Sequence, residues 1–133
     1  MKLGILTAIF DDFSFEEAVD TAAKMGFSCI EAACWPAGGA ERRYAGVSHI
    51  DVERVISDEA YRNYILEYTG KKGIEISALA YYPNTMDADL EKRAANIAHL
   101  KNVIKASALL NINLTNTFLS LIHISEPTRL QLI

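Results

Sequence analysis

Apolar and polar positions along the first 118 residues form blocks that have the lengths of strands and helices. Short runs that are almost entirely apolar predict strands covered on both faces. Between these runs, apolar residues recur every three or four positions, which predicts helices with one face packed on a sheet. The predicted strands are residues 3–8, 28–34, 74–80 and 112–118. The alternation of strand and helix indicates an α/β domain with a parallel sheet.

The helix between the first two strands has clear end signals. Ser14 is placed to cap its start, and Glu17 can return a hydrogen bond to the Ser14 amide. Gly26 can take the left-handed conformation that ends a helix. Two further helices are expected to begin at Asp51 and Asp58. The chain from residue 3 to residue 35 therefore predicts a βαβ unit.

The longest predicted helix begins after a cap at Asp87 and covers residues 88–109. Asn111 follows it, and asparagine is the usual substitute for glycine in the left-handed position that ends a helix. The face expected to lie against the sheet consists of Leu90, Ala94, Ile97, Lys101, Ile104 and Ala108. The predicted strand at residues 112–118 follows directly.

Two architectures are compatible with this pattern. A (β/α)8 barrel requires about 250 residues, so that the predicted strands supply half of one. A flavodoxin-like doubly wound sheet nearly fits the available length. The turn after the first strand contains none of the glycines of a phosphate-binding loop, which disfavours the doubly wound sheet. Periodicity alone does not decide between them.

Composition limits the class of protein. The chain has 133 residues, 50% of them hydrophobic, and a net charge of −4, which is typical of one soluble globular domain. This acidic balance disfavours a nucleic-acid partner. No segment has the apolar length of a membrane span or signal core, so we expect no membrane partner and a cytoplasmic location. Cys29 and Cys34 are expected to be buried free thiols on opposite faces of a strand.

Several motifs occur in a characteristic order: residues 1–8, residues 22–31, Trp35-Pro36, residues 74–79, Tyr82-Pro83-Asn84 and residues 116–118. Together they resemble the sugar phosphate isomerase/epimerase family, whose members are xylose isomerase-like TIM barrels related to metal-dependent apurinic endonucleases. The resemblance covers residues 1–118. It implies the amino-terminal half of a (β/α)8 barrel, with about four βα units.

The resemblance also implies which parts of such an enzyme are missing. In this family, Glu, Asp, His and Glu side chains from the second half of the barrel hold a divalent metal. We expect that metal in a full-length member and none in this chain. The implied substrate is a small sugar or polyol, phosphorylated or not. The open barrel edge is expected to promote self-association.

Residues from about Leu119 onward resemble the translated read-through of a sequencing adapter. We therefore expect residues 119–133 to be a non-native tail and residues 1–118 to form the partial barrel. The alternative is a genuine divergent tail.

Active sites of TIM barrels lie at the carboxyl ends of the strands. The candidates at these ends are Phe10, Trp35, Tyr81, Tyr82, Asn84 and Asn116. Glu31 lies within the second predicted strand and is a further candidate for substrate binding, because a carboxylate that faces the barrel interior needs a partner. Most of them also have a structural explanation: an interior ion pair or outward position for the glutamate, a lid or core position for the tryptophan, and turn chemistry for the Tyr-Pro-Asn segment. No catalytic residue can be assigned.

Four other residues are weaker candidates. Arg42 and Arg43 can clamp a phosphate, although such pairs are more often solvated. His49 and His99 have no nearby carboxylates at the spacing of a metal site, so we expect structural or surface positions for both.

The favoured function is therefore a fragment of a sugar (phosphate) isomerase/epimerase that is inactive by itself. The full-length enzyme would use metal-assisted proton transfer. Two alternatives remain open at this point. One is a metal-dependent apurinic endonuclease-like hydrolase of the same superfamily, and the other is a small non-catalytic α/β binding module.

Overall fold

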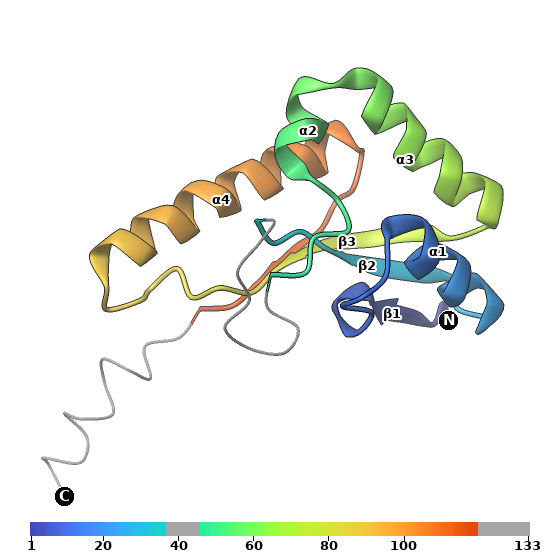
Figure 1. Cartoon of the computed structure of the whole chain (residues 1–133), viewed down its shortest axis with the longest axis horizontal. Helices are drawn as coiled ribbons and strands as arrows, with labels where there is room; N and C mark the ends of the chain where they lie inside the picture. Colours follow the sequence, from blue (N-terminus) through green and yellow to red (C-terminus); the bar gives the residue numbers. More distant parts are fainter. Residues whose placement is uncertain (37–45, 120–133) are drawn as a thin grey trace, which may run out of the picture.

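The computed structural model describes residues 1–36 and 46–119. Its centre is a four-stranded parallel sheet in the order β1-β2-β3-β4 (Figure 1). The strands are β1 (Gly4–Leu6), β2 (Cys29–Ala33), β3 (Glu75–Tyr81) and β4 (Thr115–Thr117). Each strand pairs with its neighbour in sequence, whereas a doubly wound sheet reverses its order at a switch point. The sheet is therefore that of a half barrel.

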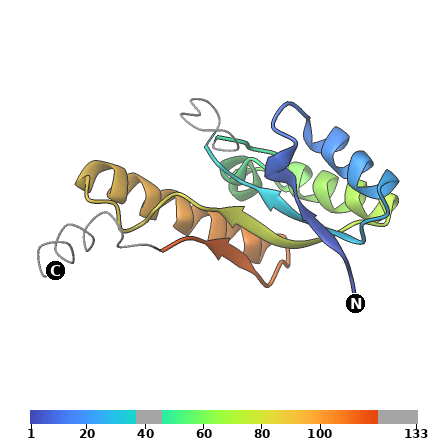
Figure 2. The same ribbon diagram turned by 90° about the horizontal axis from the view of Figure 1, so that it is seen from below.

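The helices cover one side of the sheet. They are α1 (Phe15–Lys24), α2 (Val52–Ser57), α3 (Glu59–Lys72) and α4 (Leu90–Leu109), and a short 3-10 turn, η1 (Thr7–Ile9), follows β1. Figure 2 shows that no helix of the described residues lies on the opposite face, which we call the open face. Within residues 1–36 and 46–119, no helix combines the length and apolarity needed to cross a bilayer.

The main core lies between the sheet and this helical layer. Ile30 and Leu79 from the strands pack in one cluster with Val19, Val55 and Val103 from three helices. The predicted apolar face of α1 is confirmed, since most of its members are buried. The fold is stabilised chiefly by this layer, because burial of apolar area is the dominant favourable contribution.

Most of the predicted helix ends are confirmed. The Ser14 hydroxyl accepts a hydrogen bond from the Glu17 amide, and the Glu17 carboxylate accepts one from the Ser14 amide. Gly26 and Asn111 have positive φ angles of 82° and 55°, as predicted for residues that end helices. Gly73, at φ 69°, ends α3 in the same way. These local signals fix where the chain turns back into each strand.

The predicted packing face of α4 is wrong. The six residues predicted to face the sheet lie largely toward solvent, with Ile104 53% exposed. The face that packs on the sheet contains Val103, Ala106 and Ser107. The Ser107 hydroxyl donates to the Leu114 carbonyl at 3.3 Å. Hydrophobic periodicity fails here because part of the buried face is polar while the exposed face is apolar.

The start of α4 is also later than predicted. Asp89 caps the helix by accepting hydrogen bonds from the Glu91 and Lys92 amides. Asp87 instead accepts a hydrogen bond at 2.9 Å from the Asp89 amide. Two closely spaced aspartates can each make such local turns, and the second one borders the helix.

The first and last strands are shorter than predicted, because residues 7–8 belong to η1 and residues 112–114 precede β4. The Thr7 hydroxyl accepts a hydrogen bond from the Ala33 amide at 2.9 Å. This contact ties the turn to the end of β2. The predicted tail falls almost wholly on residues 120–133, which lie outside the described residues.

The register between β2 and β3 contains one irregularity. Ile30 pairs with Ile76, but the next residue, Glu31, pairs with Ala78. Ser77 is therefore an extra residue in β3, and its hydroxyl donates to the Ile30 carbonyl at 3.0 Å. This is a β-bulge, a feature that re-aims the side chains that follow it.

Both cysteines are buried free thiols, as predicted. Cys34 belongs to the main core, and burial raises the pKa of its thiol well above the usual range. Cys29 lies against Gly4 instead, where a Cβ added to the glycine would be 2.6 Å from the sulfur. A larger residue at position 4 would therefore displace the Cys29 side chain or push β1 away from β2. Because its raised pKa keeps the Cys34 thiol protonated, Cys34 is a poor nucleophile.

Candidate functional site

Three of the predicted site residues come together on neighbouring strands, between the middle of the strands and their carboxyl ends. Glu31 lies in β2, Tyr82 directly follows β3, and Asn116 lies in β4. Glu31 alternates with Ile30 and Ala32, which belong to the core on the helix side, so its side chain lies on the open face. We call Glu31, Tyr82 and Asn116 the strand-end cluster.

A hydrogen bond joins two members of the strand-end cluster, and the third lies close by. The Tyr82 hydroxyl donates to the Glu31 carboxylate, and the Asn116 side chain is near enough to interact with that hydroxyl. Burial, followed by the contact with Glu31, raises the pKa of the Tyr82 hydroxyl well above its usual range. The phenol therefore keeps its proton at neutral pH. The cluster holds a carboxylate, a hydroxyl and an amide in fixed relative positions, with capacity left for hydrogen bonds to a ligand.

Aromatic rings border this cluster. The Trp35 and Tyr82 ring centroids are 5.7 Å apart, and the Trp35 and Tyr81 centroids are 6.0 Å apart. Such tilted and edge-on contacts are favourable for aromatic pairs. Trp35 therefore lies beside the strand-end cluster, as its position after β2 predicted.

Tyr81 and Tyr82 lie on different sides of the sheet. Tyr81 is only 2% exposed and belongs to the core on the helix side. Its hydroxyl donates to the Asn96 side chain at 3.3 Å, and its ring lies 4.5 Å from that of His99. Burial raises the pKa of Tyr81 to about 12. The structure does not bring Tyr81 onto the open face with the strand-end cluster.

Asn84 occupies a turn between β3 and α4. Its side-chain oxygen accepts a hydrogen bond from the Met86 amide at 3.0 Å, and its carbonyl accepts one from Asn96 at 2.9 Å. Asn96 therefore joins this turn to Tyr81. The local bond to Met86 is the turn chemistry that the Tyr-Pro-Asn sequence allows.

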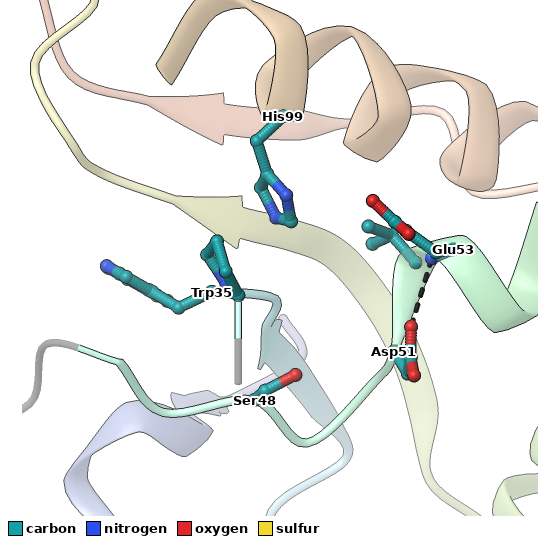
Figure 3. A pocket seen from close by; sticks show the side chains of 7 residues that line it. Trp35, Ser48, Asp51, Glu53 and His99 are labelled. Carbon is teal, nitrogen blue, oxygen red and sulfur yellow. Dashed lines mark hydrogen bonds between the residues drawn. The ribbon is translucent and has the colours of Figure 1, made fainter. Parts of the chain in front are cut away.

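A hollow lies near Trp35, between α2 and α4 (Figure 3). It has a volume of about 510 Å³, and its lining residues are Trp35, Pro36, Ser48, Asp51, Val52, Glu53 and His99. Asp51 caps α2 by accepting from the Glu53 amide at 3.1 Å, which is the dashed line in Figure 3. The His99 Nε2–H donates to the Cys34 carbonyl at 2.7 Å.

His99 was not among the site residues predicted from sequence. The available signal was its spacing on α4, since Asn96, His99 and Val103 share the face that packs toward the sheet. A search for apolar residues at helical spacing does not detect this face, because Asn96 and His99 are polar. The structure places the imidazole beside Trp35 and Tyr81, on the helix side of the sheet.

His49 is buried and structural. Its Nδ1 lies 2.8 Å from the Thr7 hydroxyl, and its Nε2 lies 3.1 Å from the Phe13 carbonyl. A carbonyl can only accept, so Nε2 carries the proton and Nδ1 accepts from Thr7. Burial lowers the pKa of His49, which favours this neutral form. The imidazole ties the turn after β1 to the start of α1. The predicted phosphate clamp of Arg42 and Arg43 lies outside the described residues.

Comparison with known proteins supports the fold. No protein-family model matches the chain, and no curated protein matches it. A crystal structure does: that of the probable 3-DHS dehydratase AsbF, involved in petrobactin synthesis, from Bacillus anthracis. The TM-score is 0.56 at 22% sequence identity, and the match covers 89% of this chain and 38% of the AsbF chain. The shared fold is that of a TIM barrel. The described chain thus corresponds to little more than a third of that barrel protein.

Proposed function

We propose that this chain forms one part of the substrate site of a TIM-barrel isomerase or epimerase that acts on a sugar or a sugar-like polyol. The observation that carries the proposal is the strand-end cluster, which brings polar groups from β2, β4 and the carboxyl end of β3 together on the open face. TIM barrels bind their substrates at the carboxyl ends of the strands. The proposal is also supported by the resemblance of residues 1–118 to the amino-terminal half of such an enzyme.

The chemistry of the cluster suits a polyhydroxylated ligand. A carboxylate such as Glu31 can accept several hydrogen bonds, so accepting from Tyr82 leaves it capacity for ligand hydroxyls. The amide of Asn116 can both donate and accept. The rings of Trp35 and Tyr82 supply an apolar wall for the C–H face of a sugar. In this arrangement the described residues bind and orient the substrate.

A divalent metal is implied by the family resemblance, and the described residues do not fit one. Within residues 1–36 and 46–119, no three His, Cys, Asp or Glu side chains stand close enough together to hold an ion. We therefore assign no metal ligand and no proton-transfer step to this part of the chain. The proposed role is substrate binding, to which the remainder of a barrel would add the reacting groups.

A dehydratase is the second candidate, because the structural neighbour AsbF is described as a probable 3-DHS dehydratase. A dehydratase acting on a polyhydroxylated ring would use the same strand-end cluster for binding. No observation favours an apurinic endonuclease-like activity. Its substrate carries phosphates, whereas the cluster presents a carboxylate.

Binding can be measured on the 133-residue chain because Trp35 is its single tryptophan. Trp35 fluorescence should change saturably on addition of pentoses, hexoses or cyclic polyols. Glu31→Gln should weaken binding by about tenfold or more, since hydrogen bonds to a charged group contribute about 1.5–3 kcal/mol. Tyr82→Phe should weaken it less, because it removes a neutral hydroxyl that positions Glu31.

The matched control is Glu53→Gln, which alters an exposed carboxylate in the hollow between α2 and α4. It should leave the affinity unchanged. The proposal fails if no polyol gives a saturable signal, or if Glu31→Gln binds as tightly as the parent chain. Equal losses in Glu31→Gln and Glu53→Gln would place the ligand elsewhere.

The enzymatic part of the proposal is tested by sequencing the source gene through and beyond the codon for Phe118. We expect the frame to continue with a glycine, a basic residue and further strand–helix units that carry Glu, Asp, His and Glu. The restored protein should then interconvert a sugar or polyol, or dehydrate it if the second candidate is correct. A frame that ends at Ile133 in the genome would overturn the enzyme and favour a small binding module.

A further inference from the structure

The peptide group between Cys34 and Trp35 is the point at which the chain leaves the sheet. The Cys34 amide still donates to the Ala80 carbonyl at 3.0 Å. The Cys34 carbonyl accepts a hydrogen bond from the His99 Nε2–H at 2.7 Å, and the Trp35 amide donates to the Val47 carbonyl at 3.1 Å. A peptide group is planar, so hydrogen bonds at its C=O and its N–H together fix its orientation.

The Cys34 carbonyl depends on His99 because it lies in the core. Cys34 is completely buried, and a buried carbonyl that loses its donor carries a free-energy cost. Without the imidazole, the peptide group would be free to rotate toward another donor. The Trp35 side chain starts from the same peptide group, so the direction of its Cα–Cβ bond depends on the hydrogen bond from His99.

A second contact runs from His99 to Trp35 through a tyrosine ring. The imidazole lies 4.5 Å from the Tyr81 ring, which lies 6.0 Å from the Trp35 ring. Asn96, on the same face of α4, accepts the hydrogen bond of the Tyr81 hydroxyl at 3.3 Å. Figure 3 shows the His99 side chain reaching from α4 toward the chain that carries Trp35. The helix therefore holds both the backbone before Trp35 and a ring against which it packs.

We propose that His99 is a positioning residue, which holds the Cys34–Trp35 peptide group and the Tyr81 ring so that the Trp35 indole forms a fixed wall of the sugar site. The inference rests on the proposed function for the role of that wall. His99 lies on the helix side of the sheet and acts on the open face only through Trp35. Its contribution is preorganisation, because a side chain that is already ordered costs less conformational entropy when a ligand binds.

Two substitutions separate the contacts of His99. His99→Gln keeps an N–H donor at a similar distance from the backbone but loses the ring, whereas His99→Phe keeps a ring but loses the donor. We expect His99→Phe to loosen the indole and to weaken sugar binding by about two- to tenfold, which corresponds to the cost of ordering one side chain. His99→Gln should restore most of both properties. His99→Leu also lacks a donor and replaces His99→Phe if that variant does not fold.

The mobility of the indole is measurable without a ligand, because Trp35 is the single tryptophan of the 133-residue chain. Time-resolved fluorescence anisotropy detects side-chain motion on the nanosecond scale. In the parent chain, we expect the anisotropy to decay with the tumbling of the whole molecule. In His99→Phe, a faster component should appear. Affinity is then measured by Trp35 fluorescence with D-xylose, D-glucose and myo-inositol as probes.

Ser107 offers a matched control on the same helix. It also lies on the buried face of α4 and donates to a backbone carbonyl, that of Leu114, at 3.3 Å. That carbonyl keeps a second donor, the Leu79 amide. Ser107 lies about 12 Å farther along the helix than His99. Ser107→Ala should therefore leave the mobility of the indole and the affinity unchanged, with circular dichroism as the check that each variant folds.

The outcomes separate this inference from the proposed function. Parent-like indole mobility in His99→Phe overturns the positioning role, and so does His99→Gln if it is as loose as His99→Phe. Equal loosening by Ser107→Ala would assign the effect to the packing of α4 as a whole and overturn it too. A looser indole with unchanged affinity would exclude a role in the site. If the parent chain binds none of the three probes, the proposed function fails, while the anisotropy still decides whether His99 holds Trp35.

Discussion

The two faces of the sheet differ in what their side chains do. On the helix side, Leu79 and Tyr81 are almost completely buried in a core shared with several helices. On the open face, Leu114 is exposed, and the polar strand-end cluster occupies the carboxyl ends. The difference teaches that the helix side supplies the stability of this fold. The open face carries no helix among the described residues and leaves polar and apolar side chains accessible.

The largest expected effect compares Leu79 in β3 with Leu114, which directly precedes β4. The Leu79 amide donates to the Leu114 carbonyl at 3.1 Å, yet the two side chains lie on opposite faces. Leu79→Ala should lower the free energy of unfolding by about 2–5 kcal/mol, because it leaves a cavity in the core. Leu114→Ala should cost less than about 1 kcal/mol at concentrations where the chain is monomeric.

Urea unfolding of both variants measures this difference. A concentration-dependent loss in Leu114→Ala, and not in Leu79→Ala, would show that Leu114 contacts another molecule in solution. Equal losses at low concentration would mean that the open face also contributes to the stability of the monomer, contrary to the comparison above.

The next effect concerns pH. Burial lowers the pKa of His49, so the unfolded chain binds a proton more readily than the folded chain. The stability that depends on neutral His49 is complete above the unfolded pKa of about 6.5 and is lost as the pH falls below it. The slope from this group cannot exceed about 1.4 kcal/mol per pH unit. Thermal unfolding between pH 8 and pH 5 should show the decline.

His49→Gln is the test of that assignment. A glutamine keeps a side-chain donor and acceptor but does not titrate in this range. The variant should be less stable than the parent at pH 8, and its stability should depend less steeply on pH between 6.5 and 5. An unchanged slope would assign the decline to other groups.

The smallest effect distinguishes the two faces of α4. Ile97→Gln should change the free energy of unfolding by no more than about 0.5 kcal/mol, because the residue lies on the exposed face. Val103→Ala should cost more, because Val103 is fully buried against the sheet. If Ile97→Gln proved as costly as Val103→Ala, the outer face of α4 would be covered in solution.

Much of the fold is predictable because its signals are local. The Ser14–Glu17 capping box and the residues with positive φ mark helix ends without reference to the rest of the chain. The packing face of α4 is not predictable in this way. Its buried side includes Asn96 and Ser107, whose polar groups are satisfied by Tyr81 and by the Leu114 carbonyl. Those partners are distant in sequence, so periodicity does not reveal them.

The candidate site was partly predictable for a similar reason. The carboxyl ends of parallel strands meet at one edge, so Glu31 and Asn116 could be expected to lie near each other. The apolar runs located the carboxyl ends of the strands. They did not indicate that His99, on α4, lies close to Trp35 on the helix side of the sheet. Contacts between a helix and a strand end depend on the rotation of that helix, which the sequence pattern misassigned.

The β-bulge at Ser77 changes which residues of β3 point to each face of the sheet. Ile74 and Ile76 point to the helix side, and strict alternation from them would send Tyr82 the same way and Tyr81 to the open face. The extra residue reverses that order, so that Tyr81 joins the core and Tyr82 meets Glu31. One inserted residue therefore decides which of two adjacent, chemically identical side chains is available for recognition. Related sequences that lack it would present the other tyrosine.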